Sequence, residues 1–524
     1  MPLPNGGGIW PPHHLTPIHH QYATLDAWFR GGADELALLY GAQGAGARPT
    51  NRPSQYRGGI VGATARWFWG APTPAGERRT KLHVPVASDI ATMSSDLLFS
   101  EPPSLTVENV QTQERIEELV ENGLQATLLE GAEVGAALGD YYLRAVWDTQ
   151  VAEKPWLAVV HADAAVPEWR WGKLAAVTFW RVVEQDDRTY LRHLERHEPG
   201  HILHGLYRGE AGDLGKQIPL SSTPATAGLE PVIETRIPKL TAVHVPNMRP
   251  NRDWRNLPAG APLGRSDFAG PVLGLMDALD ETYTSWMRDI RLGKGRLHVP
   301  KNYLEKLGPG QGAAFDPDRE LYEGLDTLGA ADGKMEITAT QFAIRVAEHR
   351  DTGAELLAAI LRATGYSAQS FGLSGEVAVT ATEVSAKERR SLTTRGRKAL
   401  YTVPPLADAV EMLLQLEVAL FGSGIEPERP TVTLADSVSP DIQQLATTAE
   451  LMRRAEAASD ETLVRLLHPD WDETEVQAEV ARIADARPKP VMDPFALPSE
   501  MTGPESEDEA PEGEEQDGPP ARQE

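Results

Sequence analysis

One stretch of the chain has the residue types and the spacing of a zinc-protease motif. Its residues His197, Glu198 and His201 match H-E-x-x-H, a pattern that sets two zinc-binding histidines one helical turn apart beside a general base. The two variable positions, however, are Pro199 and Gly200, and both residue types disfavour a helix interior. The flanking residues alternate as in strands, so the sequence predicts a β-turn with solvated histidines. A zinc hydrolase that uses these three residues is the alternative.

Two other patterns suggest a metal site or a nucleotide site, but each lacks residues that such a site needs. Four histidines near the N-terminus can bind a metal adventitiously, but two prolines and the lack of a carboxylate partner favour a mobile segment: His13, His14, His19 and His20. The runs "GKG" at 293–295 and "GKM" at 333–335 lack the Ser or Thr of a P-loop, and there is no G-x-S-x-G elbow. We therefore expect no enzyme activity, no metal and no cofactor.

Composition and charge indicate a folded, acidic, multidomain protein. The chain has 524 residues, 41% of them hydrophobic, and a net charge of −26, which predicts two to four domains. The absence of cysteine fits a reducing cytoplasm. No secretory signal is expected, because the N-terminus lacks a basic region followed by an apolar run. No membrane span is expected, because no apolar run reaches about 18 residues. The chain also stays negatively charged outside its acidic C-terminal tail, which argues against a protein that binds nucleic-acid phosphates across its surface.

The negative charge is partly concentrated at the C-terminus. From residue 491 to 524 there are eleven acidic residues and one arginine, a local charge of −10. The tail from 488 to 524 is too polar to bury a core, so we expect it to be disordered.

One segment, residues 380–400, is strongly basic in contrast to the rest. It carries six cations: Lys387, Arg389, Arg390, Arg395, Arg397 and Lys398. Three interpretations stay open, namely a solvated helix face, a surface that docks on an acidic neighbouring copy, and a contact with DNA phosphates.

Periodicity predicts the elements that must position these residues. Apolar spacing favours helices over 88–99, 112–138, 271–291 and 340–364. Three strands in a meander are expected over 175–209, after two strands near "YYLRAVWD" and "WLAVVHAD", and a further strand at "GRLHVP". A helix that starts near 381 must break or kink at Pro404-Pro405 before its apolar half continues. Two or three short helices follow residue 440.

Three stretches resemble portal proteins of tailed bacteriophages, of the SPP1-like and actinobacteriophage kind. They are "HVPVASDIATMSSDLLFSEPP" at 83–103, "TATEVSAKERRS" at 380–391 and "SDETLVRLLHPDWDETEVQAEVARI" at 459–483. The order of elements over roughly 20–490 is also similar. The resemblance implies an α+β, ring-forming subunit with an α/β wing, a two-helix stem, a small α/β clip, a long wing helix and an α-helical crown.

The resemblance also implies boundaries for these parts. They are an N-terminal segment and wing over 1–265, stem helices over 266–292 and 339–365, a clip over 293–338, a tunnel loop over 366–380, a long wing helix and return strand over 381–436, and a crown over 437–487.

What the resemblance implies about function is a portal ring, dodecameric in the family, at one capsid vertex. Double-stranded DNA is packaged through the ring by the terminase motor and later ejected, and the head–tail connector is built on it. The implied partners are further copies of the chain, double-stranded DNA, the large terminase, the major capsid and scaffold proteins and a head–tail adaptor. The protein is then a virion component assembled in the host bacterial cytoplasm. Another phage head structural protein is the second alternative, although two long helices around a small α/β insert are not expected of a capsid shell protein.

Three groups of residues follow as candidates for these roles. The channel-loop candidates are Ser367, Gln369, Ser370, Ser374 and Glu376. The clip candidates, for DNA or for the terminase or adaptor, are Lys294, Arg296, Lys301 and Lys306. The candidates for contacts between subunits are Lys387, Arg389, Arg390 and Arg397.

Overall fold

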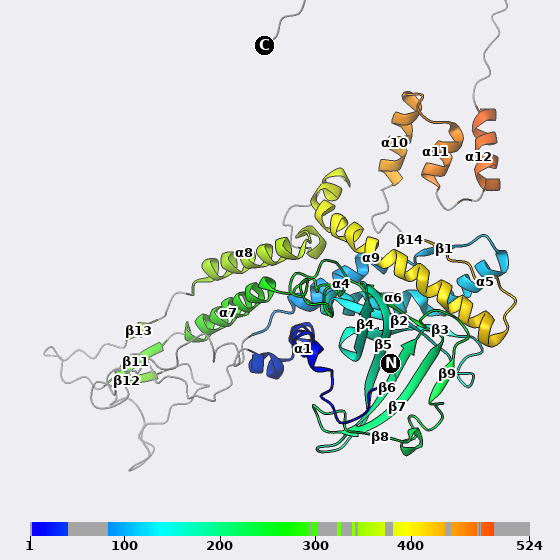
Figure 1. Ribbon diagram of the computed structural model, residues 1–524. Helices are drawn as coiled ribbons and strands as arrows, with labels where there is room; N and C mark the ends of the chain where they lie inside the picture. The colour runs from blue at the N-terminus through cyan, green and yellow to red at the C-terminus, as the bar shows by residue number, and fades with distance from the viewer. Residues whose placement is uncertain are drawn as a thin grey trace, which may run out of the picture. The chain divides into compact units, whose positions relative to one another are not determined.

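Figure 1 shows the computed structural model of the chain, which divides into two compact units, Met1–Ser439 and Pro440–Glu524. The structure describes residues 3–39, 82–293, 296–300, 322–325, 338–340, 344–372, 381–434, 442–468, 471 and 473–486. The acidic tail predicted to be disordered lies outside these residues.

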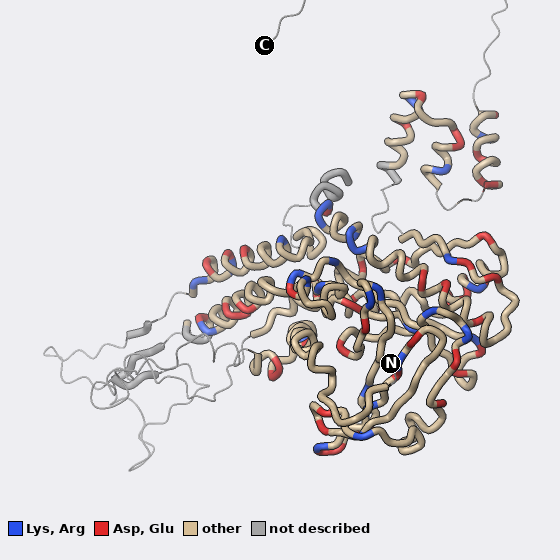
Figure 2. The backbone as a smooth tube through the Cα atoms, in the orientation of Figure 1, with Lys and Arg blue, Asp and Glu red and all other residues tan. Residues whose placement is uncertain are grey.

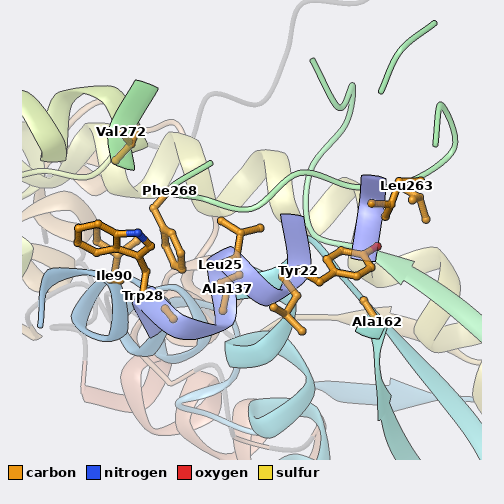
Figure 3. Packing of buried hydrophobic residues seen from close by; sticks show 14 of the residues in the cluster. Tyr22, Leu25, Trp28, Ile90, Ala137, Ala162, Leu263, Phe268 and Val272 are labelled. Atoms are coloured by element: carbon orange, nitrogen blue, oxygen red, sulfur yellow. The ribbon is translucent and has the colours of Figure 1, made fainter. Parts of the chain in front are cut away.

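A helical layer forms one half of the core of the first unit. Helices α1 (Thr16–Arg30), α4 (Val86–Phe99) and α6 (Gln125–Leu138) pack on one another. Figure 3 shows Trp28 of α1 beside Ile90 of α4, with Phe268 from a distant loop above them. Each fully buried apolar side chain of this kind stabilises the fold by about 1.5–3 kcal/mol.

The N-terminal histidines belong to this layer, so the expectation of a mobile segment there was wrong. His13 and His14 lie in the short 3₁₀ turn η1 (His13–Leu15), and His19 and His20 lie in α1. Apolar residues between them anchor the segment: Leu15, Ile18, Tyr22 and Leu25 are buried in the core. Burial also lowers the pKa of His19 to about 4.

The helix predicted over 112–138 is interrupted in the structure. Helix α5 (Val110–Leu119) passes through a π-helical turn, η2 (Val120–Leu124), before α6 begins. Asn122 and Gly123 stand at this point, and both residue types are weak helix formers. The N-terminus is capped by Asn109, whose side chain accepts a hydrogen bond from the Thr112 N–H at 3.0 Å.

Two antiparallel sheets form the other half of the first unit. The larger has the order β4-β5-β6-β7-β8, with β9 also paired to β7, and the smaller has the order β10-β2-β3. The bounds are β2 (Asp140–Val146), β3 (Trp156–His161), β4 (Ala165–Arg170), β5 (Lys173–Gln185), β6 (Tyr190–Glu198), β7 (His201–Gly209), β8 (Lys216–Ile218), β9 (Val232–Glu234) and β10 (Ala242–Pro246). The predicted three-strand meander is confirmed as β5, β6 and β7. A separate pair joins β1 (Ser104–Thr106) to β14 (Thr431–Thr433).

Two helices, α7 and α8, lie side by side beyond the sheets (Figure 1). Helix α7 (Pro271–Leu292) matches its prediction, with Pro271 in the first turn. Helix α8 (Val346–Thr364) starts six residues later than predicted, because 338–340 form strand β13 (Thr338–Thr340) instead. That strand pairs with β11 (Arg296–Pro300), the strand predicted at "GRLHVP", which also pairs with β12 (Tyr322–Leu325).

A break, one of the two outcomes expected at Pro404-Pro405, does not occur. Helix α9 runs unbroken from Ala381 to Phe421 with both prolines inside it. The residues after them are deeply buried, among them Leu406, Val410 and Leu413. This apolar packing compensates for the poor helix propensity of the two prolines. The Pro404 carbonyl also accepts a hydrogen bond from Arg429, at 3.2 Å.

The described residues of the second unit form three short helices, within the predicted two or three. They are α10 (Ile442–Arg454), α11 (Asp460–Leu467) and α12 (Glu473–Ala486). Ser459 caps α11 by accepting a hydrogen bond from the Thr462 N–H. His468 ends that helix, and its ring stacks on Trp471 with centroids 3.8 Å apart. Val476 of α12 and Leu463 and Val464 of α11 are buried.

Candidate functional site

The candidate site lies where α8 ends and α9 begins, because most described candidate residues gather there. Helix α8 stops at Gly365, which takes the left-handed conformation with φ 93°. The N–H groups of Gly365 and Tyr366 both donate to the Leu361 carbonyl at 3.0 Å. Thr394 of α9 then donates its hydroxyl to the Gly365 carbonyl at 2.6 Å. The end of α8 is therefore tied to the first half of α9.

A buried ion pair lies beneath this junction. The Lys398 ammonium is 2.6 Å from the Asp267 carboxylate, and the two side chains are 2% and 0% exposed. The same carboxylate accepts hydrogen bonds from the Tyr366 hydroxyl at 2.7 Å and from the Asn247 amide at 2.8 Å. Lys398 also donates to the hydroxyl of Ser94 in α4. Four separate segments of the chain thus meet α9 at one fully satisfied polar centre.

The electrostatics of this centre favour a structural role. Burial lowers the pKa of Lys398, and the neighbouring Asp267 carboxylate opposes that shift. Burial raises the pKa of the Tyr366 hydroxyl well above its usual value. Tyr366 therefore stays a hydrogen-bond donor at neutral pH. Because every group in the centre has a partner, it holds α9 in register against α4 and α8.

Two of the channel-loop candidates form a hydroxyl cluster with α9. The Ser370 hydroxyl lies 2.8 Å from those of Ser367 and Ser391, and the Ser367 N–H donates to Ser391 at 3.0 Å. Gln369 lies between them in the short turn η6 (Gln369–Phe371). Ser374 and Glu376 lie outside the described residues. The start of the predicted loop is thus held against α9, and a contact of its residues with DNA stays a prediction.

The basic segment of α9 divides into inward and outward side chains. Arg395 donates to the Leu97 carbonyl at 2.6 Å and Lys398 is buried, so these two face the core. Arg389, Arg390 and Arg397 are exposed. Figure 2 shows basic residues along this half of the helix. All three exposed arginines are among the predicted inter-subunit candidates.

Arg390 also donates a hydrogen bond to the Arg362 carbonyl, and both residues line a cavity of about 320 Å³ beside Tyr366. The other candidates are only partly described. The backbone of Lys387 lies in α9, and that of Arg296 begins strand β11. Lys294, Lys301 and Lys306 lie outside the described residues.

The zinc-protease pattern lies on a β-hairpin instead of a helix. His197 and Glu198 end β6, His201 starts β7, and the Pro199-Gly200 turn joins them. The predicted turn is confirmed, but the expectation that both histidines are solvated was wrong for His197. It is fully buried, and its two ring nitrogens lie 2.7 Å from the Thr241 hydroxyl and 2.8 Å from the Glu195 carboxylate.

The hairpin therefore does not set two histidines one helical turn apart, as the zinc-protease arrangement requires. Within the part of the chain that the structure describes, no three His, Cys, Asp or Glu side chains are grouped to hold a metal ion.

Comparison with known families identifies the class of this fold. A family profile described as "Phage portal protein, SPP1 Gp6-like" matches residues 60–488. The chain belongs to this family of phage portal proteins. The match covers the α8–α9 junction, both sheets and the three helices of the second unit. The resemblance seen in the sequence is thereby confirmed.

Solved structures that match this portal-family chain share little sequence with it. One is titled "Neck of native GTA particle computed with C12 symmetry"; it is 12% identical, with 84% of this chain and 97% of that chain covered and a TM-score of 0.37. Another, "Neck of empty GTA particle computed with C6 symmetry", is 13% identical, with 81% and 99% covered and a TM-score of 0.39. No curated protein matches the chain.

Among the helices in the described ranges of this portal-family chain, none is both long and apolar enough to cross a lipid bilayer.

The sequence analysis missed the polar centre formed by Asp267 and Lys398, because these two residues are 131 positions apart. The basic run of α9 was visible, but nothing in it marked Lys398 as the buried member.

Proposed function

We propose that this portal-family protein assembles into a ring, dodecameric as the resemblance implies, that forms the DNA channel at one capsid vertex. The terminase packages double-stranded DNA through the ring, the DNA later leaves through it, and the head–tail connector is built on it. The observation that carries the proposal is the match of the portal family over residues 60–488. The protein acts without catalysis, metal or cofactor, as a component of the virion assembled in the host bacterial cytoplasm.

The parts of the chain take the family's roles in this proposal. Helices α7 and α8 are the stem, and 293–338 between them is the clip, which contacts the terminase and later the adaptor. Residues 366–380 are the tunnel loop, α9 is the long wing helix, and the three helices of the second unit are the crown. The ion pair of Asp289 in α7 with Arg345 before α8, at 2.9 Å, supports a stem in which the two helices act together. The neighbouring His349 lies 2.9 Å from the same carboxylate.

Charge explains how such a ring is held together. Each subunit carries a net charge of −26, so copies repel one another unless opposite charges meet at the interface. The exposed Arg389, Arg390 and Arg397 supply positive charge on α9, while Glu114 and Glu117 are exposed acids on α5. In the proposed ring, the arginines of one copy face acids of the next wing.

The first experiment is negative-stain electron microscopy of the purified protein with mass photometry of the same sample. The expected result is a ring with a central hole and a mass close to twelve times the subunit mass of 57.1 kDa. A protein that stays monomeric, even when its capsid and scaffold partners are co-expressed, contradicts the proposal.

A charge-reversal series tests the interface. Arg389→Glu combined with Arg390→Glu is expected to abolish rings at physiological salt, because it adds repulsion where attraction is needed. Arg188→Glu is the matched control, since Arg188 is also an exposed arginine but lies in the β5–β6 turn. Rings that persist in the double variant contradict the assigned role of these arginines.

A further inference from the structure

A second contact surface appears at the tip of the β4–β5 hairpin, far along the chain from α9. The two residues of its turn are Trp171 and Gly172, with φ 52° and 76°. This is the backbone of a tight hairpin turn in which both central residues need positive φ, a position that usually holds Asn or Gly. Trp171 is also 98% exposed, the highest value among the large apolar side chains of the described residues. A bulky side chain in this conformation, held out in water, points to a function other than folding.

The neighbours of Trp171 make the tip a basic apolar knob. Arg170 and Lys173 flank the turn as a register pair, and both are exposed. An aromatic ring between two cations fits a partner that offers an apolar hollow with acidic surroundings.

The same chain carries such a hollow on other elements. A cavity of about 410 Å³ lies between α5, η2 and the chain that leads into the start of β3, with Leu119, Leu124 and Leu157 among its lining residues. Its volume is in the range of pockets that enclose a ligand of side-chain size or larger. Glu118 and Glu153 line it too, and Glu117 and Glu121 are exposed on the same helical stretch.

The positive charges at the cavity are already paired. Arg115 contacts Glu417 at 2.7 Å, and Lys154 forms an ion pair with Glu118. Glu153, which lines the cavity and is exposed, leaves negative charge at its edge.

We propose that Trp171 of one copy inserts into this cavity of the next copy, as a second inter-subunit contact that rests on the proposed ring. The knob and the cavity lie on different elements, so the contact is heterologous. Contacts of this kind close a ring when the rotation between copies allows it. The indole fills the apolar hollow, and Arg170 and Lys173 face the acids of the rim.

Disulfide cross-linking tests the contact directly, because the natural chain has no cysteine. Trp171→Cys is combined with Asn122→Cys, whose residue lines the cavity and is exposed. The expected result under oxidation is a ladder of covalent multimers, while each single variant gives nothing larger than a dimer. Rings seen by microscopy with no ladder overturn this inference and leave the proposed ring intact. A wild-type protein that forms no rings overturns both.

A second variant separates assembly from folding. Trp171→Gly removes the knob and places at φ 52° a residue that favours this conformation, so the melting temperature is expected to stay the same or rise. The concentration needed for half-assembly is expected to rise at least tenfold. Val182→Ala is the control, since Val182 is also exposed and lies on β5.

An exposed tryptophan between two cations can also bind a membrane surface. The Trp171→Gly variant distinguishes this alternative from the contact between subunits. Unchanged assembly of Trp171→Gly, with lost binding to phosphatidylglycerol vesicles that the wild type binds, overturns the inference.

Discussion

The two halves of helix α9 are held in place by different forces, although they form one continuous helix. Before Pro404 the helix is fixed by polar groups, among them Lys398 and Ser391, and turns arginines toward solvent. After Pro405 it is fixed by apolar burial against β10 and β2, with Leu413 at 0% exposure. Only Glu417, paired with Arg115, interrupts that apolar surface. The comparison teaches that a helix with a thin apolar face can be held in place by buried polar contacts.

The largest expected effect comes from breaking the polar centre of the first half. Lys398→Ala leaves the Asp267 carboxylate buried without its counter-charge, so the free energy of unfolding is expected to fall by about 3–5 kcal/mol. Urea denaturation of the unassembled subunit measures it. Replacing both partners together, as Lys398→Met with Asp267→Leu, is expected to cost less than the sum of the single changes. A loss below 1 kcal/mol for Lys398→Ala contradicts the view that this centre fixes the first half.

The second half is tested with two leucines of the same helix. Leu413→Ala removes a fully buried side chain and is expected to cost about 2–5 kcal/mol. Leu400→Ala is the matched control, because Leu400 is 73% exposed and little stability is expected to change. Thermal unfolding of the two variants should separate them clearly. Equal effects would remove the distinction between the halves.

A smaller effect is expected at the hydroxyl cluster. Ser391→Ala removes the acceptor of the buried Ser367 N–H, and an unsatisfied buried group costs about 1–3 kcal/mol. Hydrogen exchange of the Ser367 amide is expected to speed up locally. Thr393→Ala is the control, since that exposed hydroxyl bonds to the Arg389 carbonyl of its own helix. Unchanged exchange at Ser367 would show that the cluster does not hold the loop.

The smallest effect on folding is expected at the outward face of the first half. Arg397→Ala is expected to change the free energy of unfolding by no more than about 0.5 kcal/mol, because Arg397 is exposed. Ring assembly, measured by mass photometry, is expected to weaken and to weaken further as salt is raised. A variant that loses stability instead would place Arg397 with the inward residues of the helix.

Several local patterns were read correctly from a single stretch of chain. The 271–291 helix, the meander of β5 to β7 and the stop at Gly365 follow from spacing and from turn residues within a few positions. One local feature was missed, because Gly123 interrupts the helix predicted over 112–138. Other errors came where a distant segment decides. The segment around His19 was judged by its prolines, yet the core of the first unit orders it, and α8 starts late because 338–340 pair with β11 instead.

The sequence by itself determined the family, the succession of helices and strands, and the presence of a basic segment in an acidic chain. Tertiary structure decided which cations of that segment are buried, that His197 is enclosed, and that α9 continues through its two prolines. The physical reason is the range of the forces. Periodicity and capping act over a few residues, whereas the Lys398–Asp267 pair and the burial of Leu413 depend on partners more than a hundred positions away.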